Sequence, residues 1–440
     1  MARFRPNRNR RGVLYPNNSR SPENLFAWTI CGLLFLATVL NYMDRQTLSM
    51  TAPLIQRDLS LNNAQVGLLL SAFFYTYGIM QAVTGWLLDR VSVRLGYAIS
   101  VLVWSLAGIL TGFITNFREL LGCRLLLGVG EAANWPAALR TVARTMPADK
   151  RSLANGIFNS GASVGAIITP PLIVYISLRS NWRTAFIIIG LLGAIWLLLW
   201  LILTRGVLSL GRESTSPNVQ EARSCELDTS LSSWPEILSS SRFWGLVVAS
   251  VLAQPCYYFY SSWLPTYFVQ RKAVHFGTTL GTEMLLAYVG LGLGSAVGGI
   301  PVFWLSKRAW SIHRARKVTV LGLCVLVVPI MTVPHTKSLV ASIILVCAAT
   351  FGMGAWVANY LSALQDLSRR RVASIAGIVG AFGAFAGALG MWAVGLVSST
   401  AYGFGPVFVA LGVMPIIGTL GIVLPRSPGQ KQHSMRTASV

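Results

Sequence analysis

Charged residues are scarce in this chain. Of its 440 residues only 11% are Asp, Glu, Lys or Arg, whereas soluble globular proteins carry roughly 25%. Apolar residues make up 54%. A soluble helical domain needs polar faces at helical spacing, and the long apolar runs of this sequence lack them. The composition therefore excludes an ordinary soluble fold and predicts an integral membrane protein.

Cysteine and histidine are also rare, and neither forms a cluster. The six cysteines are scattered without a C-x-x-C pair, and there are only four histidines. This spacing predicts neither a disulfide framework nor a metal site. No H-E-x-x-H or G-x-S-x-G motif falls at a predicted helix end, and a phosphate-binding glycine-rich loop is absent. We therefore expect no enzyme activity, no metal and no organic cofactor.

Twelve runs are long and apolar enough to cross a bilayer, which takes about 17–25 residues. They predict an all-α integral membrane fold with twelve transmembrane helices. The runs are 25–53, 65–88, 96–115, 119–144, 153–178, 184–204, 243–269, 279–305, 318–336, 339–364, 373–399 and 404–425.

The longest polar stretch, 205–241, separates six runs from six. It predicts a cytoplasmic linker between an N-terminal six-helix half, 25–204, and a C-terminal six-helix half, 242–425. Residues 1–24 are predicted as an Arg-rich cytoplasmic tail and 426–440 as a second tail. Two pseudo-symmetric halves of six helices are a common transporter layout, with the substrate site near the membrane midplane between them.

The net charge of +22 would suggest nucleic-acid binding in a soluble protein. With both termini on the cytoplasmic side, most Lys and Arg residues fall in segments on that side, which is the positive-inside bias of a multispanning protein. No aromatic or base-reading pattern accompanies the Arg-rich start, so we expect no nucleic-acid partner. The first apolar run is too long for the core of a cleavable signal peptide.

Two charged islands interrupt the apolar runs of the N-terminal half. Asp44 and Arg45 lie side by side in the first run, and Arg124 and Glu131 lie in the fourth. A charge inside a spanning helix costs at least about 2.5–3.5 kcal/mol on insertion scales, so it usually faces a polar pathway. These four residues predict a pathway for a solute across the membrane.

Helical spacing relates the members of each island. Arg124 and Glu131 are two turns apart, so they share one face about 10 Å apart along the helix axis. Gly128 and Gly130 leave that face open for close helix approach or for a ligand.

Asp44 and Arg45 instead diverge by about 100° around their helix. One of them can therefore face a neighbouring helix while the other faces a cavity. The alternative interpretation is that the four charges form intramembrane salt bridges that only hold the two helices together, although buried pairs are not reliably stabilising.

The loop after the second run reads Gly85-Trp-Leu-Leu-Asp89-Arg90-Val-Ser-Val-Arg94. An Asp at a helix end, paired with nearby Arg residues, can latch neighbouring cytoplasmic helices in one conformation and release them in another. We predict such a conformational latch at Asp89, Arg90 and Arg94. The simpler alternative is that Arg90 and Arg94 only maintain the topology.

This loop resembles the signature loop of the major facilitator superfamily. Within that superfamily the N-terminal half is similar to the anion:cation symporter branch, and most similar to its hexuronate and glucarate transporters. The matching strings cover most of 25–204. They are NYMDRQTLS from Asn41, RLLLGVGEAANWPA from Arg124, GIFNSGASVGA from Gly156 and NWRTAF from Asn181.

The C-terminal half resembles the branch more loosely, through strings that include Tyr258 and Asn359. It departs from the pattern at the second signature loop, where Ser306 and Lys307 stand in place of an acidic residue. It also lacks the acidic residue that family members often have near Gln254.

The resemblance implies proton-coupled uptake of an organic anion, a sugar acid such as a hexuronate or an aldarate, by alternating access. It implies a monomer in a bacterial inner membrane, with the proton as coupling ion and no other cofactor. By position it assigns proton coupling to Asp44 and Glu131. The substrate-binding residues that it implies are Arg45, Arg124, Tyr42, Tyr258 and Asn359.

The residue types suit these roles. Arginine donates two parallel hydrogen bonds to a carboxylate and stays charged at any working pH. Burial favours the protonated form of an acid, whereas a nearby arginine favours the charged form. An anion that occupies the arginines would weaken their hold on the acids, so proton and anion would load together. An organic anion or organophosphate exchanger, a drug:proton antiporter of the same fold, and a sensor without flux remain open alternatives.

Overall fold

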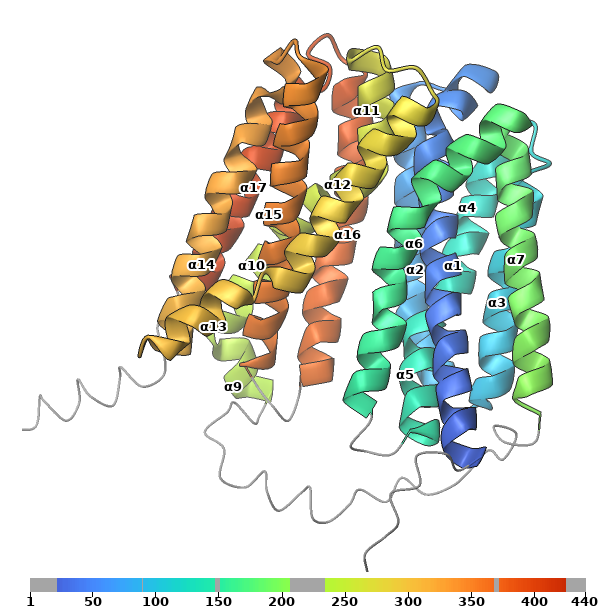
Figure 1. Ribbon diagram of the computed structural model, residues 1–440, viewed down its shortest axis with the longest axis horizontal. Helices are drawn as coiled ribbons and strands as arrows, with labels where there is room; N and C mark the ends of the chain where they lie inside the picture. The colour runs from blue at the N-terminus through green and yellow to red at the C-terminus, as the bar shows by residue number, and fades with distance from the viewer. Residues whose placement is uncertain (1–21, 89, 147–150, 206–233, 368–371, 425–440) are drawn as a thin grey trace, which may run out of the picture.

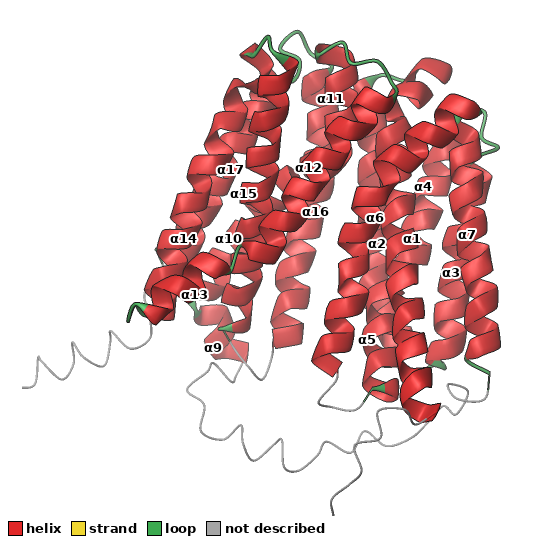
Figure 2. Ribbon diagram, viewed as in Figure 1, coloured by secondary structure: helices red, strands yellow, loops and turns green. Residues whose placement is uncertain are grey.

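The structure is a computed structural model that describes residues 22–88, 90–146, 151–205, 234–367 and 372–424. The described residues form helices joined by short loops and contain no strand (Figure 2). The predicted all-α fold is therefore confirmed. Most of the predicted linker, at 206–233, and nearly all of the two predicted tails, at 1–21 and 425–440, lie outside the described residues.

The helices form two bundles that stand side by side (Figure 1). The first bundle contains α1 (Pro22–Asp58), α2 (Asn63–Leu88), α3 (Val93–Thr111), α4 (Phe117–Glu131), α5 (Asn134–Thr145), α6 (Arg151–Arg179) and α7 (Trp182–Leu203).

The second bundle begins with the short helix α9 (Trp234–Ser239). It continues with α10 (Ser241–Ser262), α11 (Leu264–Arg271), α12 (Thr278–Val297), α13 (Ile300–Lys307), α14 (Ile312–Val327), the 3₁₀ helix η2 (Val328–His335), α15 (Leu339–Gln365), α16 (Val372–Ser398) and α17 (Gly405–Val423).

Nine helical stretches among the described residues are long and apolar enough to cross a membrane. The other three predicted spans correspond to α2, to α4 with α5, and to α10 with α11. Large apolar side chains point outward along these helices, for example Leu198, Ile202 and Val325, which are 60%, 61% and 71% exposed. Such a surface suits lipid rather than water. The protein is a multi-pass membrane protein.

Four predicted continuous spans are interrupted near a proline, which cannot donate a helical hydrogen bond, and in two of them a side chain binds the freed carbonyl. Pro136 lacks the N–H that would reach the carbonyl of Ala132, and α4 gives way to α5 there; the Thr84 hydroxyl donates to that carbonyl at 3.4 Å. Pro265 follows the break between α10 and α11, and the Tyr288 hydroxyl donates to the carbonyl of Ser261 at 2.9 Å. Side chains thus satisfy the freed backbone groups, as the bilayer interior requires.

Glycines bring the helices of the first bundle into close contact. A Cβ on Gly128 would lie 2.5 Å from the Phe73 carbonyl oxygen of α2, and a Cβ on Gly130 would lie 2.6 Å from the Trp104 nitrogen of α3. Gly165 of α6 approaches the Val39 carbonyl of α1 in the same way. Of the two roles open to Gly128 and Gly130, the structure shows close helix approach.

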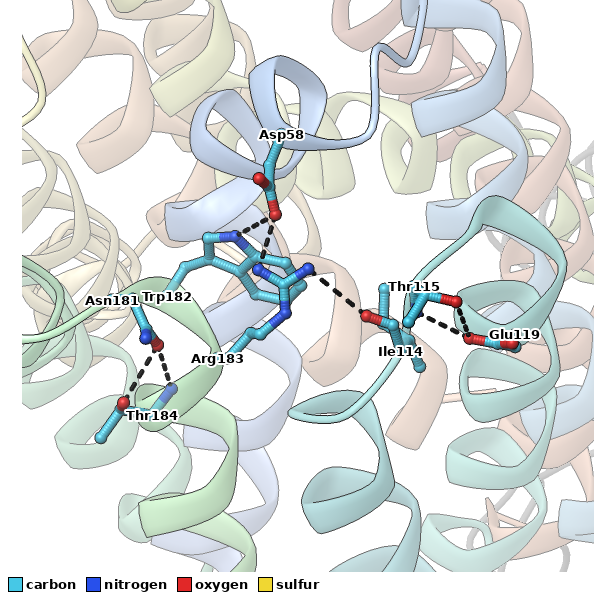
Figure 3. Close-up of polar contacts among 8 residues, drawn as sticks. All are labelled: Asp58, Ile114, Thr115, Glu119, Asn181, Trp182, Arg183 and Thr184. Atoms are coloured by element: carbon cyan, nitrogen blue, oxygen red, sulfur yellow. Dashed lines mark hydrogen bonds and ion pairs between the residues drawn. The ribbon is translucent and has the colours of Figure 1, made fainter.

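We call the end of the molecule at which α1 begins the proximal end, and the end at which α1 finishes the distal end. At the distal end the first bundle is tied together by Asp58, at the end of α1 (Figure 3). Its carboxylate accepts hydrogen bonds from Arg183 at 2.6 Å and from the Trp182 indole at 3.2 Å. Arg183 also donates to the Ile114 carbonyl at 3.4 Å, so α1, the loop after α3 and α7 are linked at this point.

The two bundles also meet at the distal end. Gln270 of α11 donates to Gln56 and accepts from Asn63, at 3.2 and 3.1 Å, and Gln56 donates to Asn63 at 2.7 Å. Beside this amide network, α2 and α16 touch backbone to backbone, because a Cβ on Gly67 would lie 3.0 Å from the Cα of Gly395. These contacts hold the two bundles together near the distal end.

Candidate functional site

One face of α1 carries a row of polar residues at the middle of the molecule. Tyr42, Arg45, Gln46 and Ser49 follow the spacing i, i+3, i+4, i+7, which places them on a single helical face. All four line a cavity between the two bundles. A polar face that points away from lipid and toward an internal space is the usual sign of a solute pathway.

The cavity has a volume of about 340 Å³, within the size range of small-molecule sites. Helices of both bundles contribute to its wall. Its described lining residues are Tyr42, Arg45, Gln46, Ser49, Phe74, Tyr77, Trp135, Ala162, Ser163, Ala166, Gln254, Tyr257, Tyr258, Ser261, Ser262, Tyr288, Leu291, Gly292, Ser295 and Val357. Arg45 is the one charged residue among them.

Arg45 is held in place by a carboxylate and three aromatic rings. Its Nε donates to Glu131 Oε2 at 2.6 Å. Its guanidinium carbon lies 5.2 Å from the ring centre of Tyr42, 5.0 Å from that of Phe73 and 4.5 Å from that of Tyr77, within the range of cation–π attraction. The side chain remains 18% exposed, and its Nη2 has no partner among the described residues.

Glu131 stands behind Arg45, away from the cavity wall. It is fully buried, and only one of its carboxylate oxygens is engaged, because Oε1 has no hydrogen-bond partner among the described residues. A buried carboxylate costs free energy unless it is paired and hydrogen-bonded. Arg45 therefore provides the pairing that permits a charged Glu131 here.

Asp44 points away from the cavity, toward α3. A Cβ on Gly108 would lie 3.3 Å from Asp44 Oδ1, and the Asp44 side chain is 3% exposed. Its Oδ2 has no partner among the described residues. The divergence of Asp44 and Arg45 that their spacing predicts is thus present. Asp44 faces the neighbouring helix α3, and Arg45 faces the cavity.

Arg124 does not reach the cavity wall. It is 3% exposed, its Nε has no partner among the described residues, and its guanidinium lies 5.7 Å from the ring centre of Phe186 in α7. It is close enough to both Asp44 and Glu131 for electrostatic attraction. The four charges of the sequence prediction therefore form one buried group, and Arg45 alone connects it to the cavity.

The opposite wall comes from the second bundle. Gln254, Tyr257, Tyr258 and Ser261 repeat along α10 with helical spacing, and Tyr288 and Ser295 lie two turns apart on α12. Tyr258 stacks on Phe74 of α2, with ring centres 4.0 Å apart. The predicted residues Tyr42 and Tyr258 therefore face the same space as Arg45.

Asn359 of α15 is not part of this arrangement. It is buried and donates to the carbonyls of Gly298 and Ala355, at 2.7 and 2.9 Å. Its amide nitrogen thus joins α15 to the end of α12 and is not turned toward the cavity, whereas Val357 does line it. The structure does not bring Asn359 together with the other predicted binding residues.

Charges in apolar runs do not predict most of the polar residues in the cavity wall. Gln46, Ser49, Tyr288 and Ser295 are uncharged, and isolated polar residues in spanning helices usually serve packing. The signal that finds them is spacing, because Gln46 and Ser49 share a face with Arg45, and Tyr288 and Ser295 share one on α12.

The predicted latch is only partly described. Asp89 lies outside the described residues. Arg94, in the first turn of α3, donates to the Leu201 carbonyl at 2.8 Å and to the Thr204 hydroxyl at 3.0 Å. Arg94 therefore fastens α3 to the end of α7, and a latch role for Asp89, Arg90 and Arg94 stays a prediction.

Comparison with known proteins identifies the family. The chain matches the Major Facilitator Superfamily over residues 34–391. It belongs to this superfamily. Members of the superfamily similar to it include the hexuronate transporter of Escherichia coli strain K12, 31% identical over 416 residues that cover 91% of this chain and 94% of the relative. The D-galactonate transporter of Escherichia coli O6:H1 is 29% identical, covering 93% of this chain and 97% of the relative.

A probable galactarate/D-glucarate transporter of Bacillus subtilis is 28% identical, over 80% of each chain. The predicted resemblance to sugar acid transporters of the superfamily is therefore confirmed. A solved bacterial homologue of the human lysosomal transporter Spinster, in an inward-facing and unoccupied conformation, has the same fold, with a TM-score of 0.74 at 18% identity over 93% of this chain and all of that one. The protein is a membrane transporter of this superfamily and not an enzyme.

Proposed function

We propose that the protein is a secondary active transporter that takes up an organic anion, a sugar acid such as a hexuronate or an aldarate, together with a proton. The main support for this proposal is the composition of the cavity wall. Arg45 is the one charged side chain among the described lining residues, and hydroxyl and amide groups surround it. A sugar acid combines a carboxylate with several hydroxyls, so it complements this wall. The sugar acid transporters among the similar proteins support the same class.

In this proposal Arg45 binds the substrate carboxylate. Its Nε is occupied by Glu131 and its Nη2 is buried without a partner among the described residues, but the side chain as a whole is 18% exposed beside the cavity. Tyr42 and Tyr258 would hydrogen-bond substrate hydroxyls, with Gln46 and Gln254 as further partners on the two walls. Arg124, which is buried behind the wall, would act through Asp44 and Glu131 in this conformation.

Coupling would follow from the sharing of Arg45. When a substrate carboxylate binds the guanidinium of Arg45, its negative charge offsets part of the positive charge of the guanidinium. The attraction between Arg45 and Glu131 then decreases. Glu131 has no exposed surface, so the loss of pairing favours its protonated form. Proton and anion would then load together. Asp44, which lies near Arg124, is the second proposed proton carrier, and no coupling agent other than the proton is proposed.

Transport would proceed by alternating access. The amide network of Gln56, Asn63 and Gln270 joins the bundles at the distal end, and it would have to separate to admit substrate from that side. We assign the proximal end, with both termini, to the cytoplasm of a bacterial inner membrane. A monomer suffices for this scheme because the cavity lies within one chain.

The test is uptake into proteoliposomes with an imposed inward proton gradient. Glucuronate, galacturonate, glucarate, galactonate and simple dicarboxylates would be offered to the wild type, Arg45→Gln, Arg124→Ala and Asp44→Asn. We expect gradient-driven uptake of at least one sugar acid, and its loss in each variant. Arg57→Gln is the matched control, because Arg57 is exposed at the distal end of the same helix, and it should keep uptake.

Two outcomes would overturn the proposal. If none of the acids is taken up, the proposed substrate class is wrong. Uptake that ignores the proton gradient but requires a counter-anion inside the vesicles would show an exchanger instead of a symporter.

A further inference from the structure

A second, smaller cavity lies at the proximal end of the second bundle, far along the helices from the first. It is lined by residues from the start of α10, the start of α14 and the ends of α15 and α17. Its charged lining residues are Arg242 of α10, Arg316 and Lys317 of α14, and Asp366 just after α15. No part of the proposed transport mechanism uses this cavity.

The cavity has more positive than negative charge. Arg316 forms an ion pair with Asp366, and its side chain is 9% exposed. Arg242 has no ion pair among the described residues, although it lies within electrostatic range of Asp366. Three cations therefore face one carboxylate, and two positive charges are left without a counter-ion among the described residues.

Hydrogen-bond donors are also left over. The Nε atoms of Arg242 and Arg316 are both buried, and neither has a partner among the described residues. A buried donor without a partner costs free energy comparable to a lost hydrogen bond, more when it is charged. Both arginines line the same small cavity, so an acceptor bound there would lie beside two guanidinium groups with unsatisfied donors.

Helix fastening accounts for only part of the cluster. Lys317 donates to the Val423 carbonyl at the end of α17, just as Arg94 donates to the Leu201 carbonyl near the end of α7 in the first bundle. Lys317 therefore has a structural role that the other half repeats. The free donors of Arg242 and Arg316 have no such explanation.

The size of the cavity limits the acceptor. Its volume is about 40 Å³, whereas one water needs roughly 10–15 Å³ on this measure. The space suits a group of a few heavy atoms. Arginine forks match the oxygens of phosphate, and lysine adds a point charge.

Exposed apolar side chains lie beside this cavity. Val318 and Leu420, the neighbours in sequence of the lining residues Lys317 and Gly421, are 45% and 40% exposed apolar side chains. We propose that Arg242, Arg316 and Lys317 bind a phosphoryl group at this cavity, carried by the headgroup of an anionic phospholipid or present as free phosphate. The bound group joins the proximal ends of α10, α14 and α17.

Binding is tested with the full-length purified protein. In one arm, detergent-solubilised protein is titrated with inorganic phosphate, with sulfate-free chloride buffer of equal ionic strength as the reference, and the melting temperature is followed. In the other arm, protein in phosphatidylcholine nanodiscs is titrated with phosphatidic acid, and retained phospholipid is counted by native mass spectrometry. A ligand that binds the folded state raises the melting temperature with its concentration.

Variants locate the site. Arg242→Gln leaves the Arg316–Asp366 pair intact and should weaken phosphoryl binding roughly tenfold or more, the effect of one charge-assisted hydrogen bond. Arg316→Gln should weaken it at least as much. Arg314→Gln is the control, because Arg314 is exposed on the same helix and stacks on Trp310 at 4.8 Å; it should bind as the wild type does.

The two arms separate the sources. Retention of phosphatidic acid without a response to inorganic phosphate identifies a lipid site, and a response to inorganic phosphate identifies a site for free phosphate. The proposal is overturned if neither ligand binds the wild type. It is also overturned if Arg242→Gln and Arg314→Gln reduce binding equally, because the positive surface as a whole would then be responsible.

Discussion

At the scale of single residues, Arg45 connects two environments. Its Nε is bound to the buried Glu131, while its side chain as a whole is partly exposed beside the cavity. Lysine could not replace it on both sides, because an ammonium group is a point charge without a planar fork. In the proposed mechanism the same guanidinium therefore responds to a substrate and transmits that response to an acid that the substrate does not touch.

Gly130 provides a prediction at this scale. A Cβ at this position would lie 2.6 Å from the Trp104 backbone nitrogen, and a backbone atom cannot move aside cheaply. Gly130→Ala should lower stability by about 1–3 kcal/mol, the usual cost of overpacking, measured as a lower melting temperature in detergent. Gly122→Ala on the same helix is the control, because nothing lies within 4 Å of its added Cβ. Equal melting temperatures for the two variants would contradict the close packing of α4 on α3.

The sequence predicts that a residue belongs to the site only where its type is unusual at that position in the chain. A charge in an apolar run stands out, so Asp44, Arg45, Arg124 and Glu131 could be found, and helical spacing predicted that Asp44 and Arg45 diverge. The direction of Arg124 could not be predicted, because it depends on the ring of Phe186 from another helix. Asn359 was assigned from a matched string, but its contacts with Gly298 and Ala355 depend on how α15 packs on α12.

At the scale of helices, the apolar runs predicted where the spans lie but not where they break. Length and hydropathy describe the lipid-facing surface, which is the same for a continuous and a broken helix. A break depends on whether another helix offers a donor for the freed carbonyl, as Thr84 does for Ala132 and Tyr288 does for Ser261. That information belongs to a pair of helices and cannot be found in one run.

The contact of α2 with α16 gives a prediction at the helix scale. A Cβ on Gly395 would lie 2.5 Å from the Asn63 carbonyl oxygen, so Gly395→Leu should separate the bundles at the distal end. Spin labels at Arg57→Cys and Lys337→Cys, two exposed distal positions in different halves, should report longer distances in this variant. Gly377→Leu, on the same helix with open space around it, should leave the distances unchanged. No lengthening with Gly395→Leu would show that this contact does not close the distal end.

At the scale of the whole molecule, the cavity belongs to neither half alone. The first bundle supplies Arg45 together with Tyr42, Gln46 and Ser49, and the second supplies further tyrosine, serine and glutamine side chains. Apart from Tyr258, the part of the wall that comes from the second bundle could not be predicted. Its residues are common polar types whose role depends on the placement of one bundle against the other.

The central claim is that substrate and proton meet at the Arg45–Glu131 pair. The most direct measurement is proton uptake when a sugar acid is added to the purified protein in weakly buffered solution, followed with a pH indicator. We predict proton uptake by the wild type and by Glu119→Gln, whose carboxyl lies exposed at the start of the same helix (Figure 3). Glu131→Gln should still bind the sugar acid but take up fewer protons than the wild type, with Asp44 as the remaining proposed carrier. Undiminished proton uptake by Glu131→Gln would contradict the account.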